Sequence, residues 1–381
     1  MKTIVVTLLS IFILSCAGEQ LSDPTPKDKL IYPVITALSK DESKLFVANT
    51  NFDLRYRGAS ILVIDLESNK ILPEETKLTD SFLSDIKIDY ENELLFTVSK
   101  NNTKLYAYDL SQNSPYLSCN EDKDGNCDKN HILELNNSTP AVLETDPERK
   151  LIYIGYKSGP IVSAVSYEKS DDKLKLKLLT TFKLKDIKGN ITDIFYDKDS
   201  DKVYVATDYS KYLASFRPLR DYYGNISKIK FFPMIKVTNR ALLVNSRTNV
   251  ENIVKKDDKL LLSLSNPSSI SILTPQELYG EQTFTFENSV YTDYFPAQTL
   301  CLPSPSSICL SSLYDSKNLA IWDINNEIPL YNLNIKKRVY SLTYSEKRKE
   351  IYVTLFIDNA IMVINADENS KNFLKIKNLI Y

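Results

Sequence analysis

Apolar and polar residues alternate along most of the chain, with the period of two that β-strands require. The segment Lys173 to Leu178 shows the alternation most clearly, since three lysines interleave with three leucines. Successive side chains of a strand point to opposite faces, so such a segment has one apolar and one polar face. A helix would space its apolar residues three and four apart, and no long segment does so. The pattern predicts an all-β protein.

A short acidic or polar turn followed by an apolar strand recurs along the chain. Copies of this turn–strand motif occupy residues 41–48, 89–96, 146–154, 199–206, 257–262 and 345–353. Each copy leads, after another polar turn, into a further alternating strand; clear examples lie at 60–65, 104–109, 318–323 and 359–364. Four antiparallel strands in a meander form the blade of a β-propeller.

Seven such units can be counted, beginning near residues 32, 83, 139, 190, 250, 296 and 338. Spread over residues 31–381, they average about 50 residues, in the range of known propeller repeats. We therefore predict a seven-bladed β-propeller of four-stranded antiparallel blades over residues 31–381. The sixth unit is the weakest, with its second strand expected at Ser306 to Ser312, so six or eight blades would also fit.

The turn–strand motif also resembles the YVTN-type family of β-propellers. Lys44 to Asn49 together with Ile61 to Asp65 match that family best, and the copies at Lys202 and Glu350 match well. The resemblance implies the fold but no particular function, because propellers serve binding, scaffolding and catalysis alike. We expect the first and last units to share a blade or to pack edge to edge, since a free edge would invite aggregation.

The first residues are typical of an export signal. Lys2 precedes an apolar run from Ile4 to Leu14 that is too short to span a bilayer. The run ends in Ile13-Leu14-Ser15-Cys16, which resembles the lipobox of bacterial, and in its relaxed form spirochaetal, lipoproteins. The resemblance implies a signal peptide over 1–15, acylation of Cys16 and a polar tether over 16–30. We expect the lipid to anchor the protein to the cell envelope, at the periplasmic or surface face of the outer membrane. The alternative is an ordinary secretory signal.

The net charge argues against nucleic acid as a partner, and the cysteine content favours disulfides. The 47 Lys and Arg against 49 Asp and Glu give a net charge of −2, which provides no basic field for nucleic acid. Beside Cys16 the chain has four cysteines, and an even number in an exported protein favours disulfides. Local pairs, Cys119 with Cys127 and Cys301 with Cys309, are preferred among the three possible pairings.

The segment from Cys119 to Asp128 is similar to the start of an EF-hand calcium loop. Oxygen side chains at Asn120, Asp122, Asp124 and Asp128 surround Gly125, which permits a sharp bend. The twelfth position is His131 where the EF-hand has a bidentate glutamate, and Glu134 would reach the ion only from an irregular loop. The segment therefore predicts either a calcium site or a solvated acidic loop closed by a disulfide.

The sequence offers little that is typical of catalysis. His131 is the only histidine, no nucleophile elbow accompanies it, and no phosphate-binding or dinucleotide-binding glycine pattern occurs. We therefore expect a protein that is not an enzyme. Calcium is the one cofactor that the sequence suggests.

Two long connections are the candidate binding loops. The first, Asn51 to Gly58, contains Phe52, Arg55, Tyr56 and Arg57, and the second, Pro218 to Asn249, contains Tyr222 and Tyr223. Aromatic and arginine side chains concentrate at the centres of interfaces, although they would also pack loops onto a propeller rim. The leading hypothesis is a binding or scaffold module for a protein or matrix partner. The alternatives are a periplasmic hydrolase or lyase with a metal site at the central channel, and an outer-membrane assembly scaffold.

Overall fold

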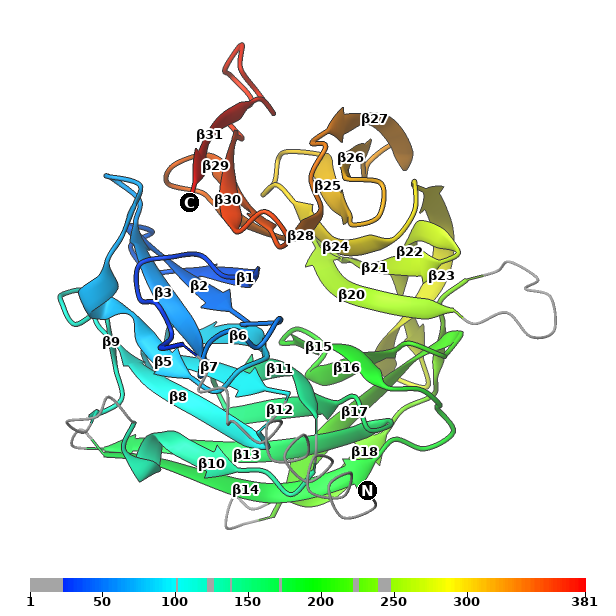
Figure 1. Ribbon diagram of the computed structural model, residues 1–381. Helices are drawn as coiled ribbons and strands as arrows, with labels where there is room; N and C mark the ends of the chain where they lie inside the picture. Colours follow the sequence, from blue (N-terminus) through cyan, green and yellow to red (C-terminus); the bar gives the residue numbers. More distant parts are fainter. Residues whose placement is uncertain are drawn as a thin grey trace, which may run out of the picture.

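The protein is a seven-bladed β-propeller, as the computed structural model shows for residues 23–100, 102–121, 127–137, 139–170, 173–221, 226–238 and 248–381. The chain forms seven antiparallel sheets in sequence order, each built as a meander. Figure 1 shows the first strand of each sheet near the centre, with the later strands of most blades farther out. The predicted fold class and blade count are confirmed, and the blades begin within a residue or two of the predicted positions.

The first four blades contain most of the irregular outer strands. Blade 1 consists of β1 (Pro33–Leu38), β2 (Lys44–Asn49), β3 (Ala59–Asp65), β4 (Lys70–Ile71) and β5 (Lys77–Thr79), with the 3-10 turn η1 (Pro73–Glu75). Blade 2 consists of β6 (Leu83–Asp89), β7 (Leu94–Ser99), β8 (Lys104–Leu110), β9 (Leu117–Ser118) and β10 (Ile132–Glu134), with η2 (Lys129–His131). Blade 3 consists of β11 (Pro140–Asp146), β12 (Leu151–Tyr156), β13 (Ile161–Ser170) and β14 (Lys173–Lys183). Blade 4 consists of β15 (Ile191–Asp197), β16 (Lys202–Thr207), β17 (Tyr212–Arg220), β18 (Ile226–Phe231) and β19 (Ile235–Lys236).

The last three blades are regular. Blade 5 consists of β20 (Asn249–Lys256), β21 (Lys259–Asn266), β22 (Ser268–Leu278) and β23 (Glu281–Tyr291). Blade 6 consists of β24 (Pro296–Cys301), β25 (Ile308–Leu313), β26 (Asn318–Asp323) and β27 (Ile328–Asn334). Blade 7 consists of β28 (Val339–Ser345), β29 (Glu350–Leu355), β30 (Ala360–Asn365) and β31 (Ile376–Ile380). No helix in the described part of the chain has the length and apolar character of a membrane span.

The second strand of a blade is the most deeply buried. Every residue of β2, β7, β12, β16 and β29 is buried, because a neighbouring blade covers each face of these strands. Strands covered on both faces carry continuous apolar runs rather than alternation. This explains the aromatic and β-branched residues of the turn–strand motif, whereas the outermost β27 is almost wholly exposed.

Blades 1 and 7 close the ring by packing their faces together. Each blade is complete in itself, so the expectation of a shared blade or an edge-to-edge contact is wrong. The Oγ1 atoms of Thr36 and Thr343 lie 2.8 Å apart, and the carboxylate of Glu42 accepts hydrogen bonds from Ser345 Oγ and Lys347 N–H. An apolar cluster that includes Leu45, Ile64, Tyr352 and Ile361 fills the interface. Side-chain burial, rather than strand pairing, holds the ring closed.

Both predicted disulfides are present. Cys119 is bonded to Cys127 and Cys301 to Cys309. The second bond links registered partners of the β24–β25 hairpin. Such bonds are typical of proteins that fold in an oxidising compartment.

Candidate functional site

All seven innermost strands line one cavity at the mouth of the central channel. Its volume is about 410 Å³, and Lys100, Lys157 and Tyr314, which follow second strands, complete its rim. The register of each innermost strand shifts within its first few residues. Bulges of this kind redirect side chains, and the residues at or beside the shift line the cavity: Ile35, Asp85, Val142, Asp193, Asn252, Gln298 and Ser341.

Polar residues at four of these bulges, in blades 2, 4, 5 and 6, connect their blade to the next. Each accepts a hydrogen bond from a backbone N–H of the following innermost strand: Asp85 from Leu143 (2.9 Å), Asp193 from Ile253 (2.7 Å), Asn252 from Thr299 (3.0 Å) and Gln298 from Leu342 (2.7 Å). A buried N–H without a partner is costly, so these bonds stabilise the ring. In blades 5 and 6 the acceptor is a neutral amide. The fold therefore does not require the negative charge that the carboxyl groups of Asp85 and Asp193 can carry at the same positions.

A buried cluster of charges surrounds Lys87. Asp85 and Lys87 are two residues apart on β6 and thus share a face, while Lys87 Nζ lies 3.1 Å from Glu144 Oε2 on β11. Burial raises the pKa of Asp85 to about 7, although the ammonium of Lys87 acts in the opposite direction. Burial likewise raises the pKa of Asp193 to about 6. Burial by itself would lower the pKa of Lys87, but the carboxylates of Glu144, Asp85 and Asp193 raise it above its ordinary value.

This arrangement provides both partners of acid–base chemistry near neutral pH. A carboxyl group with a pKa of about 7 can accept a proton from water and return it, because its two forms are similarly populated. The ammonium of Lys87 stays charged and can stabilise a developing oxyanion. About one third of the Lys87 side chain remains exposed, so it is accessible from the cavity.

Two further lysines stand at the rim. Lys100 donates its backbone N–H to Phe82 and Lys157 donates to Thr139, which places them at equivalent positions of blades 2 and 3. Burial lowers the pKa of Lys100, and the charge of Lys157 adds to the effect. Among the residues that the structure describes, neither ammonium forms a salt bridge with a carboxylate. Lys100 and Lys157 thus place two ammonium groups in a lining that also contains the carboxyl groups of Glu251 and Asp315.

The residues present do not form a metal site in the described part of the chain, where no three His, Cys, Asp or Glu side chains are grouped to hold an ion. Asp122 and Asp124 of the predicted calcium loop lie outside the described residues. Asp128 accepts the N–H of Asn130 (2.7 Å), and the Asn120 amide lies 3.4 Å from His131 Nε2. The calcium assignment stays a prediction.

His131 has a structural environment. It is buried, and its Nδ1 lies 3.0 Å from the carbonyl oxygen of Ala107. Its ring is not among the residues that line the channel cavity.

The first predicted binding loop reaches the same face as the cavity, because the ring of Phe52 contacts Phe356, which contacts Tyr340 of the cavity lining. Arg55 pairs with Asp53 at 3.0 Å, Tyr56 bridges to Asp23, and Arg57 donates its N–H to Asp23. The second predicted loop needs correction, because residues from Pro218 to Phe231 belong largely to the β17–β18 hairpin. Tyr222 and Tyr223 lie outside the described residues.

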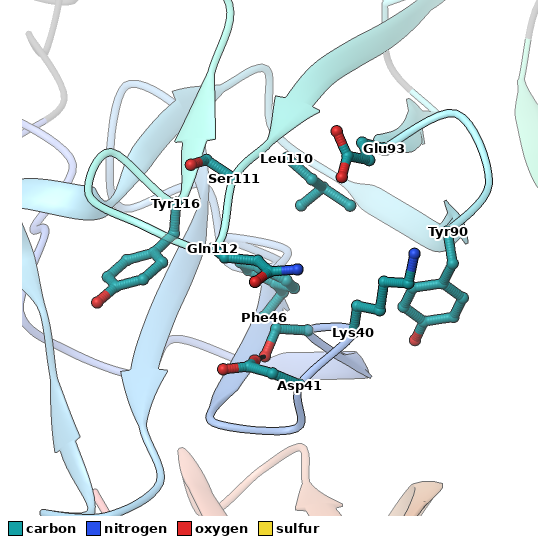
Figure 2. A pocket seen from close by; sticks show the side chains of 10 residues that line it. Lys40, Asp41, Phe46, Tyr90, Glu93, Leu110, Ser111, Gln112 and Tyr116 are labelled. Carbon is teal, nitrogen blue, oxygen red and sulfur yellow. Dashed lines mark hydrogen bonds between the residues drawn. The ribbon is translucent and has the colours of Figure 1, made fainter.

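A second cavity lies between blades 1 and 2, near their first hairpins (Figure 2). Lys40, Tyr90, Glu93, Leu110 and Tyr116 line it, and Tyr90 donates its hydroxyl to the carbonyl of Leu38. Its volume of about 30 Å³ suits one water molecule. It is too small for a substrate.

Comparison with known proteins identifies the fold and no family. No family model matches the chain, and neither does any curated protein. The YVTN-type resemblance therefore stays a prediction. The periplasmic gluconolactonase of Pseudomonas aeruginosa matches with a TM-score of 0.64 and 10% identity, covering 91% of this chain and 95% of that chain.

Two other solved structures match to a similar degree. A candidate 6-phosphogluconolactonase from Bacteroides fragilis has a TM-score of 0.56 and 12% identity, covering 79% of this chain and 84% of that chain. A protein from Lactobacillus plantarum has a TM-score of 0.61 and 12% identity, with coverages of 80% and 85%. At these identities the likeness shows the fold alone.

These comparisons overturn the expectation that the protein is not an enzyme. Propellers that match this chain over most of its length include proteins named as lactonases. The error came from searching for histidine-rich and glycine-rich motifs, whereas carboxyl and ammonium groups support acid–base catalysis equally well. Sequence reasoning missed Asp85, Lys87 and Asp193. The signal for Asp85 and Asp193 was a carboxyl group at the register shift of a unit's innermost strand, where the other units carry apolar or neutral residues.

Proposed function

We propose that the protein is a hydrolase that opens cyclic esters of the lactone class in the channel cavity, without a bound metal. The observation that carries the proposal is the juxtaposition of Asp85 and Lys87 on one face of β6 within the cavity. The lactonase names among the matching propellers support the choice of reaction, because they show that this fold accommodates it.

The reaction would begin with ionised Asp85 taking a proton from water. The resulting hydroxide attacks the carbonyl carbon of the lactone, and the ammonium of Lys87 stabilises the oxyanion that forms. The ring C–O bond then breaks, and the alkoxide leaving group receives the proton held on Asp85. The product is an open hydroxy acid, which releases its carboxyl proton to solvent, and Lys100 and Lys157 would attract the resulting carboxylate.

The test is a panel of five- and six-membered sugar and aliphatic lactones, assayed with the purified full chain against a blank without protein. We expect kcat/KM to rise with pH through about pH 7, because the base form of Asp85 is required. Chelator treatment should leave the rate unchanged. A panel in which no lactone opens faster than the blank would refute the proposal.

We further propose that the protein is exported and anchored to the cell envelope by acylated Cys16. The two disulfides support export. The lipobox-like sequence before Cys16 supports the anchor.

Replacing Cys16 by serine is expected to move the protein from the membrane fraction to the soluble fraction, because two or three acyl chains are what hold such a protein at a bilayer. The measurement is phase partition in detergent, together with the mass of the N-terminal peptide. Ser22→Ala is the matched control and should stay in the membrane fraction. A wild-type N-terminal peptide of unmodified mass would contradict the assignment.

A further inference from the structure

Aromatic rings form a continuous arc on the face of the propeller that carries the channel mouth. We call this the aromatic arc and define it as Phe82, Phe52, Tyr32, Phe356, Tyr340 and Tyr314. The centroid of Phe52 lies 6.0 Å from that of Phe82, 6.1 Å from Tyr32 and 5.7 Å from Phe356. Tyr340 continues the arc, at 5.9 Å from Phe356 and 6.0 Å from Tyr314.

The arc leads into the cavity proposed as the active site. Tyr340 and Tyr314, at one end, also line that cavity, whereas Phe52 near the other end is 58% exposed. The arc passes over blades 2, 1, 7 and 6, which are far apart in sequence. Phe356, between these two ends, is only 9% exposed and belongs to a core cluster, so a ligand held in the cavity could extend outward only across the exposed rings of Tyr340 and Phe52.

The backbone beneath the arc is unusual for aromatic residues. Tyr32 and Phe82 each precede an innermost strand and have φ values of 49° and 63°. The equivalent residue of blade 6, Phe295, has a φ of 58°, and its ring lies 6.2 Å from Tyr314. Left-handed backbone disfavours bulky residues, and glycine or asparagine would adopt it at lower cost. The same conformation occurs at Thr139 before blade 3 and at Tyr279 outside the arc, so it belongs to the fold and does not by itself assign a role to the rings.

The loop that carries Phe52 is held firmly. Asn51 is buried, donates its amide to Tyr56 O at 2.7 Å and accepts the N–H of Tyr56. Gly58 exchanges hydrogen bonds with Thr25, and any side chain there would collide with the carbonyl oxygen of Thr79. An exposed ring on an ordered loop loses little conformational freedom when it binds.

Polar groups lie around the rings. The Tyr32 hydroxyl donates to Asp53 at 3.4 Å, and the guanidinium of Arg338 lies over the face of the Tyr314 ring, 5.2 Å from its centroid. Asp315 is exposed beside Tyr314. The rings pack against one another mostly edge to face, and the exposed rings of Phe52 and Tyr340 are the ones that could stack on a pyranose ring, which has C–H faces and a hydroxyl edge. Nucleic acid fits less well, because the net charge of −2 provides no field for phosphates.

We propose that the aromatic arc binds a chain of sugar rings, so that the substrate is an oligosaccharide whose terminal sugar carries the lactone. The proposal rests on the proposed function for the identity of the reacting end. Sugar binding by the arc can nevertheless be measured without any reaction.

Direct binding is measured by calorimetry with cellotetraose, maltotetraose and chitotetraose, none of which contains a lactone. We expect one of the three to bind the wild-type protein. Phe52→Ala should weaken that binding about three- to tenfold, because one aromatic contact is lost. Phe52→Trp should restore it. The matched control is Tyr279→Ala, which removes a 92% exposed ring from the β22–β23 hairpin and should bind like the wild type.

A kinetic measurement compares the lactone of a disaccharide acid with the lactone of the monosaccharide acid. The wild-type protein should prefer the disaccharide in kcat/KM, and Phe52→Ala should reduce that preference. Oligosaccharide binding without hydrolysis of any lactone would support the arc and refute the proposed reaction. Hydrolysis without oligosaccharide binding or preference would refute the arc, as would tighter binding of a proline-rich peptide. A Phe52→Ala protein that only melts earlier would assign the rings to packing and also refute it.

Discussion

Replacing Asp85 by asparagine is expected to lower kcat/KM for lactone hydrolysis by about 10²–10⁴-fold, the range typical of losing a general base. The amide can still accept the N–H of Leu143, as the amide of Asn252 accepts that of Thr299 in blade 5. The fold should therefore survive while the proton acceptor is lost. The measurement is the pH–rate profile of the purified variant beside the wild type.

The same variant should be more stable than the wild type at high pH. Burial raises the pKa of Asp85 from 3.8 to about 7, so the folded state binds a proton that the unfolded state releases near pH 4. The wild type therefore loses stability as pH rises from about 4 to 7, by up to about 4 kcal/mol, and asparagine does not titrate. The gain in melting temperature should be small at pH 4 and largest above pH 7.

The control for both effects is Glu67→Gln, in the exposed turn after β3, which should change neither the rate nor the pH dependence of stability. An Asp85→Asn protein with wild-type kcat/KM would remove Asp85 from the mechanism. A melting difference that does not depend on pH would contradict the raised pKa.

Replacing Tyr352 by alanine is expected to lower the free energy of unfolding by about 3–5 kcal/mol, the range for removing a large buried ring. Tyr352 is fully buried in the cluster between blades 7 and 1, and its hydroxyl donates to Glu350 at 2.6 Å. No strand is shared across this interface, so the void left by the missing ring would weaken the apolar packing that helps to close the propeller. Denaturant unfolding measures the loss, and hydrogen exchange should rise in β1 and β28.

The matched variant is Tyr204→Ala, which removes the equivalent ring from the interface of blades 4 and 5. Its unfolding free energy should fall by a similar amount, but exchange in β1 and β28 should not change, because the chain itself joins blades 4 and 5. Tyr352→Phe keeps the ring and should lose only about 1 kcal/mol with the hydrogen bond. If both alanine variants raised hydrogen exchange in β1 and β28 equally, the claim that the interface of blades 7 and 1 depends more on side-chain packing than the other blade interfaces would be wrong.

Local patterns were sufficient to predict most of the fold. The second strands carry continuous apolar runs because two blades cover them, and the acidic turns recur because each joins the first two strands of a blade. Few glycines were needed in these turns, since Glu42, Glu93, Lys150 and Asp201 adopt the left-handed backbone there. The local disulfides were predictable because their cysteines are close in sequence.

The site depended on contacts between distant parts of the chain. Asp85 and Lys87 look like ordinary charges on a strand, and only closure of the propeller buries Asp85 and brings both residues near Glu144 and Asp193, which shifts their pKa values. Phe52 was recognised as a candidate contact residue, but its arc requires rings from blades 2, 1, 7 and 6.

The sequence by itself thus determined strands, repeats, turns and blade count, because these follow from side-chain periodicity over a few residues. Only the tertiary structure decided how the ring closes, which charges are buried and which rings meet. Those properties arise from desolvation and packing between segments that are far apart in the sequence, and local side-chain periodicity carries no information about which of these segments meet.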